Sequence, residues 1–157
     1  NGIACGGGLE IMISTDIIVA AEHATFALPE INVGVIADAA TIKLRRRIPY
    51  HVAVEFLMTG RWMDTKEAKH WGLINEIVPS KDLLKRAREI ANNIANGPNL
   101  IYSSIKEALR ETENVDEQPA FKTLRSLESV KKVYGSKDLV EGATSFVKKN
   151  SPKWKGE

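Results

Sequence analysis

Three consecutive glycines at positions 6–8 constrain the start of this chain more than any other feature of its sequence. A glycine in a helix interior costs about 1 kcal/mol relative to alanine, so such a run is unfavourable there. The run favours a tight turn that opens a helix, and we expect a short apolar helix over residues 9–15, ending at Asp16. Because a turn of this kind is unusual at the edge of a domain, we also expect the chain to begin partway through a longer protein.

The composition is that of a soluble globular protein. The chain has 157 residues, of which 43% are hydrophobic and 27% charged, and this excludes a disordered tail, a collagen and a disulfide-stapled miniprotein. The 22 basic and 20 acidic side chains leave a net charge of +2. So small a surplus favours neither nucleic acid nor a membrane surface as a partner.

Cysteine and histidine give no sign of a disulfide or a metal site. Cys5 is the only cysteine, which fits a reducing compartment and predicts a cytoplasmic protein. His23, His51 and His70 match no metal-ligand spacing, so we expect no metal.

The pattern of apolar residues predicts a mixed α/β first half and a helical second half. Strands are expected at 17–21, 25–28 and 73–78, a loop at 31–37, and helices at 38–47, 49–60 and 64–71. Asp64 and Glu67 have capping-box spacing, and Gly72 suits a C-cap. Four further helices are expected at 83–96, 100–110, 117–134 and from Ser136 or Asp138 to 149. We therefore expect a ββα-type core over 1–79 and a helical region over 80–157.

The glycine run is also a candidate binding or catalytic site, because amide N–H groups at a helix start can bind a phosphate or stabilise an oxyanion. It matches neither a dinucleotide fingerprint nor a P-loop, and the chain has no G-x-S-x-G elbow. The alternative is a turn that only needs close backbone packing. Arg45–Arg47 form a basic run that is typical of a solvated helix end.

Two glutamates are candidates for proton transfer. Glu10 stands among apolar residues just after the glycines, and Glu30 follows the second expected strand. Two short strands joined by a turn can bring these carboxylates together beside the amide donors, where they would suit proton transfer at carbon or activation of water. The alternatives are a first-turn Glu10 that only satisfies the helix dipole and a Glu30 that is a solvated loop residue.

Several motifs in order resemble the enoyl-CoA hydratase/isomerase (crotonase) superfamily. They are Asn1-Gly2-x-Ala4-x-Gly6-Gly7-Gly8-x-Glu10, Phe26-Ala27-Leu28-Pro29-Glu30, Met58-Thr59-Gly60-Arg61, the segment 67–79 and the closing segment 136–149. The 26–30 segment and the end at 152–156 are most similar to the carnitinyl-CoA dehydratase branch of that superfamily.

The resemblance implies a lyase that reversibly adds water to an α,β-unsaturated acyl-CoA. Gly7 would donate its N–H to the thioester oxygen, Glu10 would orient or deprotonate water, and Glu30 would exchange a proton with the substrate carbon. Phe146 and Lys149 match positions that help hold the CoA adenosine-phosphate end across a subunit boundary. No separate cofactor is implied, since CoA is part of the substrate.

The resemblance further implies a crotonase-type ββα superhelix of which only the C-terminal part is present. The helical region would form trimers that can pair into hexamers, and the chain by itself would hold a partial, inactive site. Residues 37–41 read Ala-Asp-Ala-Ala-Thr, without the glycines usual in the family. Two alternatives therefore stay open, an enoyl-CoA isomerase and a non-catalytic acyl-CoA-binding subunit.

Overall fold

The computed structural model describes every residue, 1–157, and its contacts divide the chain into two units, Asn1–Glu89 and Ile90–Glu157. This division lies inside helix α5 (Leu83–Ala95) rather than between residues 79 and 80. Strands occur only in the first unit, and the second is helical, so the chain is of mixed α/β class.

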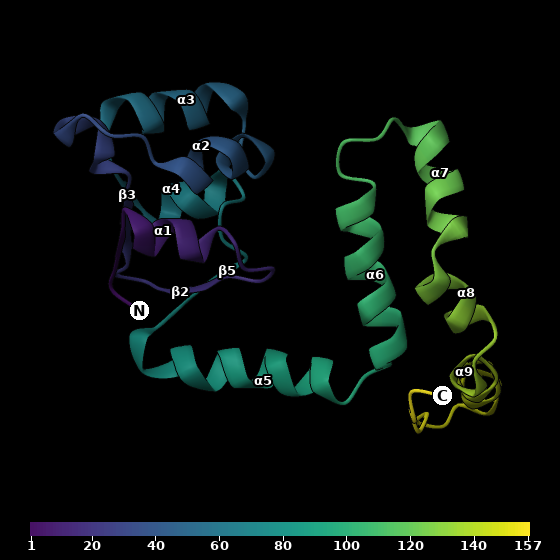
Figure 1. Cartoon of the computed structure of the whole chain (residues 1–157). Coiled ribbons are helices and arrows are strands. Elements are labelled where there is room, and N and C mark those ends of the chain that lie inside the picture. Colours follow the sequence, from purple (N-terminus) through teal and green to yellow (C-terminus); the bar gives the residue numbers. More distant parts are fainter. The chain divides into compact units, whose positions relative to one another are not determined.

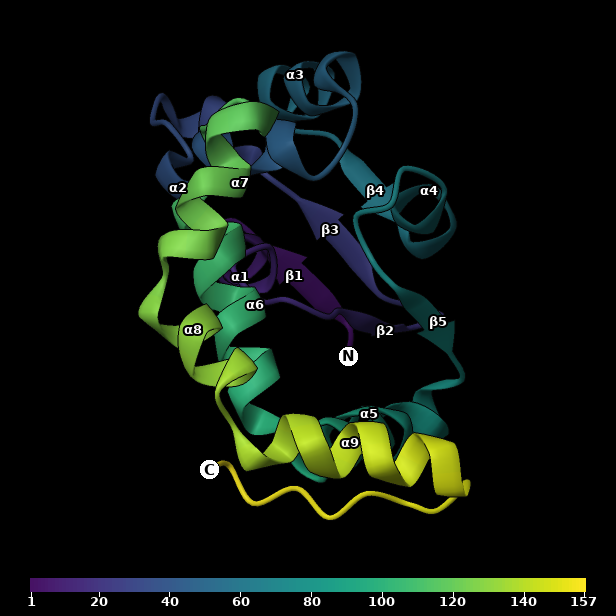
Figure 2. The ribbon, with the colours of Figure 1, turned by 90° about the vertical axis from the view of Figure 1, so that its right-hand side faces the viewer.

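Two small sheets frame the first unit (Figure 2). One has the order β1 (Ile3–Cys5), β3 (Thr25–Ala27), β4 (Trp62–Asp64), with β1 and β3 parallel and β4 antiparallel to β3. The other pairs β2 (Val19–Ala21) with β5 (Glu76–Val78) in parallel. The three predicted strands exist but are shorter than expected. β1 and β4 were not predicted, because three residues show no periodicity.

The helices of the first unit begin and end largely where the local signals place them. They are α1 (Gly7–Met12), η1 (Pro29–Val33), α2 (Asp38–Lys43), η2 (Leu44–Arg46), α3 (Tyr50–Thr59), α4 (Thr65–His70) and η3 (Ser80–Asp82), and α5 begins in this unit. Asp64 accepts the Glu67 N–H at 2.8 Å, which confirms the expected N-cap of α4. The helix expected over 38–47 instead splits into α2 and η2, and the expected loop at 31–37 begins as the 3₁₀ turn η1.

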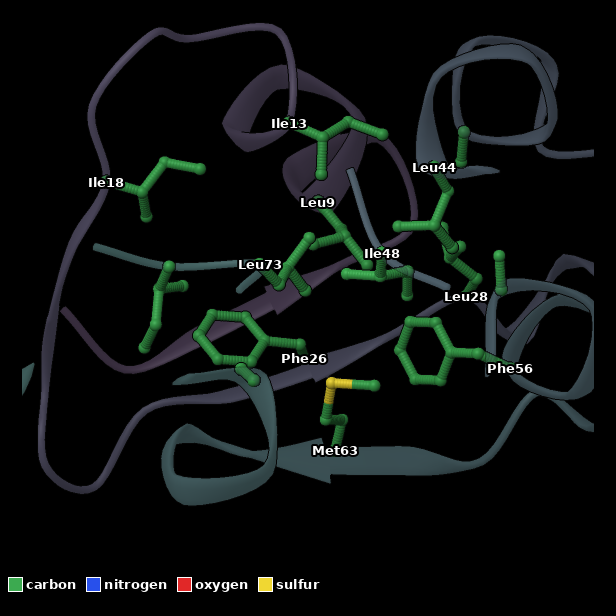
Figure 3. Close-up of a cluster of buried hydrophobic side chains, with 14 of the residues drawn as sticks. Leu9, Ile13, Ile18, Phe26, Leu28, Leu44, Ile48, Phe56, Met63 and Leu73 are labelled. Carbon is green, nitrogen blue, oxygen red and sulfur yellow. The ribbon is translucent and has the colours of Figure 1, made fainter. Parts of the chain in front are cut away.

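A core of apolar side chains packs α1 against the sheet (Figure 3). Leu9 on α1 and Ile13 at the C-cap of that helix are buried together with Phe26, Phe56 and Met63. Each such side chain stabilises the fold by about 1.5–3 kcal/mol relative to exposure. This packing holds α1, and the glycines at its start, in a fixed position on the strand ends.

The second unit contains α6 (Asn99–Glu111), α7 (Glu117–Ser126), α8 (Glu128–Tyr134) and α9 (Lys137–Lys148). Helix α6 packs beside α7 and α8 (Figure 1). The prediction of a single helix over 117–134 is wrong. The helix is interrupted at Leu127, whose ψ is 129°. Ser136 caps α9 by accepting the Leu139 N–H at 3.2 Å. No helix of either unit has the length and apolar character needed to cross a bilayer.

Candidate active site

The pairing of β1 with β3 brings the glycine turn and Glu30 to the same edge of the sheet. The two strands are parallel and in register, with Cys5 opposite Ala27. The chain leaves both strands at their carboxyl ends, Gly6 after β1 and Leu28 after β3. Gly6 donates its N–H to the Ala27 carbonyl oxygen at 3.0 Å and extends this pairing by one residue. Residues 24 positions apart therefore meet because of the register, and not because of the turn between β2 and β3.

The Glu30 carboxylate lies directly against Gly6. A Cβ built on Gly6 would stand 2.9 Å from Glu30 Oε1, so no larger residue fits there without a shift. Gly6 also has φ 56° and ψ −126°, a conformation that is essentially restricted to glycine. The other carboxylate oxygen, Oε2, is buried and has no hydrogen-bond partner in the chain. A buried acceptor without a partner is unfavourable, which makes this oxygen a natural contact for a ligand.

Glu10 lies one turn further along α1 and is held by helix α2. Its N–H donates to the Gly6 carbonyl oxygen at 3.1 Å, and its Oε1 accepts the Ala40 N–H at 3.0 Å. The N-cap residue of α2 is Ala37, which has no side-chain acceptor. The carboxylate of Glu10 thus satisfies one of the free amides at the start of α2. Its Oε2 accepts no hydrogen bond within the chain.

Gly7 and Gly8 form the first turn of α1 and are exposed. Their N–H groups donate to no acceptor of the chain, because the residues four positions earlier belong to β1. A Cβ on either glycine would meet nothing within 4 Å, so a ligand can approach this backbone closely. Glu30 therefore lies beside the turn that carries these amides, and Glu10 lies one helical turn further along α1, with its carboxylate on the Ala40 amide.

A pocket of about 370 Å³ opens beside Glu30. Its walls come from η1, the segment after it, α2, η2 and α3, and most of its side chains are apolar, among them Leu28, Ile31, Val54 and Met58. Glu10 is not among the lining residues. The pocket belongs wholly to the first unit, and Glu30 provides its only acidic group.

A separate ionic cluster stabilises the segment that follows α3. Arg61 binds Glu67 through two hydrogen bonds of 2.9 and 2.5 Å and binds Glu55 at 2.7 Å. The hydrogen bonds from the Arg61 guanidinium hold the pKa of Glu67 below its usual value. Hydrogen bonds to Glu67, opposed by burial and helped by Glu55, raise the pKa of Arg61. The Glu67 carboxylate also accepts from Trp71 Nε1 at 3.2 Å. This cluster connects α3, β4 and α4 and has no place in the candidate site.

Residues 1–157 match the enoyl-CoA hydratase/isomerase family over the whole chain. The chain belongs to this family. It is 39% identical over 159 aligned residues to a carnitinyl-CoA dehydratase of Proteus mirabilis (strain HI4320), and 37% identical over 159 to one of Escherichia coli (strain K12). Each alignment covers 99% of this chain but 61% of the relative, so the chain spans about three fifths of their length.

Solved structures of enoyl-CoA hydratases share its fold. The enzyme of Bacillus anthracis superposes with a TM-score of 0.93 at 35% identity, covering 100% of this chain and 60% of that one. The enzyme of Mycobacterium tuberculosis H37Rv has a TM-score of 0.93 at 29% identity, covering 100% of this chain and 62% of that one. The crotonase fold expected from the motifs is therefore confirmed.

The two residues expected to hold CoA belong to the second unit of this crotonase chain. Phe146 is 85% exposed on α9, and Lys149 ends that helix with φ 56°. Their role in CoA binding stays a prediction, as do the roles of Gly7, Glu10 and Glu30.

Two features of the site are not indicated by the sequence pattern. The first is the Ala40 amide as the partner of Glu10, for which the one available signal was a helix start at 37–38 without a capping side chain. The second is the pocket, with Arg45 on its wall. Arg45 was expected to lie on a solvated helix end, and it is indeed exposed, but it also faces this pocket.

Proposed function

We propose that the protein containing this chain is an acyl-CoA hydratase/dehydratase that reversibly adds water to an α,β-unsaturated acyl-CoA. The observation that carries this proposal is the grouping of Glu10, Glu30 and unpaired main-chain amides around the turn at Gly6. Hydration of a double bond conjugated to a thioester needs these three components: a group that activates water, a group that supplies a proton, and donors for the negative charge on oxygen.

Each component has a place in the proposed reaction. The thioester oxygen would accept the Gly7 N–H, which stabilises the enolate formed when the hydroxyl of water bonds to the β carbon. Glu10, anchored through Oε1 by Ala40, would use Oε2 to orient the water and take its proton. Glu30 would deliver a proton to the α carbon from Oε2, the oxygen without a partner. Dehydration reverses these steps, and the thioester bond is unchanged.

The relatives support the acyl-CoA part of the proposal, since they are named as carnitinyl-CoA dehydratases and enoyl-CoA hydratases. CoA would enter as part of the substrate, without a separate cofactor, and Phe146 and Lys149 would contact its adenosine-phosphate end. We place the reaction in the cytoplasm, on the basis of the single cysteine.

We also propose that the helical region mediates trimerisation, with hexamers formed from paired trimers. Helix α9 carries exposed apolar side chains, including Val140, Phe146 and Val147, of which Phe146 and Val147 are 85% and 80% exposed. Apolar side chains exposed to this extent on one helix are typical of a surface that contacts another chain.

An enoyl-CoA isomerase is a second candidate, because one observation favours it. Glu10 already binds the Ala40 amide, whereas Glu30 has a free buried oxygen. Moving a double bond between carbons requires a single base that removes and returns a proton, and Glu30 alone could serve.

Two substitutions in the protein at its natural length separate these candidates. Glu10→Gln keeps an oxygen that can accept the Ala40 N–H, so it removes the charge without removing the contact. A hydratase should lose most turnover of a 2-enoyl-CoA in both Glu10→Gln and Glu30→Gln, whereas an isomerase should keep turnover of a 3-enoyl-CoA in Glu10→Gln. The exposed Glu22, changed to Gln, is the matched control. Binding of acyl-CoA without turnover by the unmodified protein would instead indicate a non-catalytic subunit.

A further inference from the structure

Arg45 places a positive charge on the wall of the pocket beside Glu30. It comes from η2 and is the only basic residue among those that line the pocket. It forms no ion pair with an acid of the chain, in contrast to Arg61 and Arg86, which bind Glu67 and Glu76. Arg45 is exposed, and its charge on the pocket wall has no ion-pair partner within the chain.

Glu30, the single acid of the pocket, already has a role in the proposed proton transfer. The Glu30 carboxylate lies against Gly6, at the strand ends where the proposed chemistry takes place. A carboxylate that exchanges a proton with the α carbon must face the reacting end of the acyl group. Among the residues of this chain, no second carboxylate lines the pocket to compensate a positive charge at the far end of that group.

The residues of this chain also form no aromatic cage of the kind that recognises quaternary ammonium groups. Tyr50 is its only aromatic side chain. That ring is 64% exposed and packs edge-on against His51, with 5.8 Å between ring centroids and 72° between planes. The remaining walls are almost entirely aliphatic, formed by residues such as Leu28, Val54 and Leu57. They offer favourable contacts to a hydrocarbon chain and none specific to a cation.

We infer that Arg45 is a specificity-determining residue, which makes the pocket reject acyl groups that carry a positive charge and accept uncharged aliphatic ones. This inference rests on the proposed function. It separates the present protein from the relatives named as carnitinyl-CoA dehydratases, because a carnitinyl group carries a trimethylammonium cation. Membership of the enoyl-CoA hydratase/isomerase family does not require the same acyl group.

The test compares two thioesters of the same carbon skeleton, crotonyl-CoA and 4-trimethylammoniocrotonyl-CoA, with the protein at its natural length. We expect kcat/KM to be at least about tenfold higher for crotonyl-CoA, because the positive charge of Arg45 repels the trimethylammonium group of the other thioester. Arg45→Gln should narrow this ratio about tenfold by improving turnover of the cationic thioester, and Arg45→Glu should narrow it further. Arg47→Gln is the matched control: it removes the same charge from an exposed position outside the pocket and should leave the ratio within about twofold.

The outcomes distinguish this inference from the proposed function. Preference of the unmodified protein for the cationic thioester would overturn the role of Arg45, and so would an equal change of the ratio in Arg45→Gln and Arg47→Gln. Failure to hydrate either thioester would overturn the proposed function. Calorimetry with butyryl-CoA and 4-trimethylammoniobutyryl-CoA would then decide the charge selectivity, with tighter binding of butyryl-CoA supporting it and equal or weaker binding refuting it. Circular dichroism of each variant checks that the fold is retained.

Discussion

Glu30 Oε1 lies beside Gly6, near the ends of two parallel strands, 2.9 Å from the position that a Cβ on Gly6 would occupy. We predict that Gly6→Ala lowers the free energy of unfolding by about 1–3 kcal/mol, since its φ of 56° with ψ −126° strains any other residue. It should also displace the Glu30 carboxylate and reduce kcat at least about tenfold, the change produced by about 1.4 kcal/mol in the barrier.

Gly8→Ala is the control for that substitution. A Cβ on Gly8 meets nothing within 4 Å, and the residue is helical. Chemical denaturation should show a free energy of unfolding that is unchanged or raised by up to about 1 kcal/mol, because alanine favours a helix over glycine. Equal losses of stability in the two alanine variants would contradict the backbone strain at Gly6 as the reason.

The contribution of Glu10 to stability should be separable from its contribution to turnover. Glu10→Ala removes the acceptor of the Ala40 N–H and should lower the free energy of unfolding by about 1 kcal/mol, as the loss of a helix N-cap does. Glu10→Gln keeps an acceptor and should cost less. Thermal unfolding and steady-state turnover, measured on the same samples, should show both variants inactive but only the alanine variant clearly destabilised. Full hydratase turnover in Glu10→Gln would remove this residue from the chemistry.

The Arg61–Glu67 pair should make stability depend on pH in the acid range. Arg61 lowers the pKa of Glu67 in the folded state, so the unfolded chain takes up a proton at higher pH than the folded one does. The stabilisation is therefore complete above about pH 4.3, the unfolded value, and is lost as the pH falls through the lowered folded pKa.

Because the Arg61 and Glu67 side chains are 29% and 32% exposed, we expect the pair to contribute only about 0.5–1 kcal/mol at pH 7. Tm should be lower for Glu67→Gln than for the unmodified protein at pH 7, and the difference should shrink as the pH is lowered below about 4. Glu22→Gln serves as the control with no ion pair. A Tm difference that is constant from pH 7 to the acid limit would show that the charge of Glu67 is not the cause.

Asp138 should hold the C-terminal segment on α9. It is buried, and its two carboxylate oxygens accept the N–H groups of Lys155 and Gly156 at 2.8 and 2.9 Å. Asp138→Ala should lower the free energy of unfolding by about 1–3 kcal/mol and Asp138→Asn by less, since asparagine keeps one acceptor.

Hydrogen exchange measured on the same two variants should show faster exchange at residues 153–157 in Asp138→Ala. Glu128→Ala, at a side chain that is 87% exposed on α8, is the control and should leave this exchange unchanged. Protection of the last five residues equal to that of the unmodified protein would mean that other contacts, such as Trp154 against Gly142, suffice.

Local chemistry determined much of the secondary structure. The start of α4 is marked by the capping pair Asp64 and Glu67, and α3 lies between a proline and a glycine. These residues act on their neighbours in the chain, so the sequence alone predicts their effect. The interruption of the helix at Leu127 could not be predicted from the sequence, because neither glycine nor proline stands there. The three-residue strands β1 and β4 were equally hidden, since they exist only through pairing with β3.

The sequence by itself therefore determined the family, the two candidate acids and the glycine turn, because these depend on which residues are present and in what order. Only the tertiary structure decided how they meet. The parallel register of β1 and β3 places Glu30 against Gly6. The packing of α1 on α2 brings the Glu10 carboxylate within hydrogen-bond distance of the Ala40 N–H. Helix η2 places Arg45 on the wall of the pocket. Such contacts join residues far apart in the chain, and they form only when burial of the shared core fixes the elements against one another.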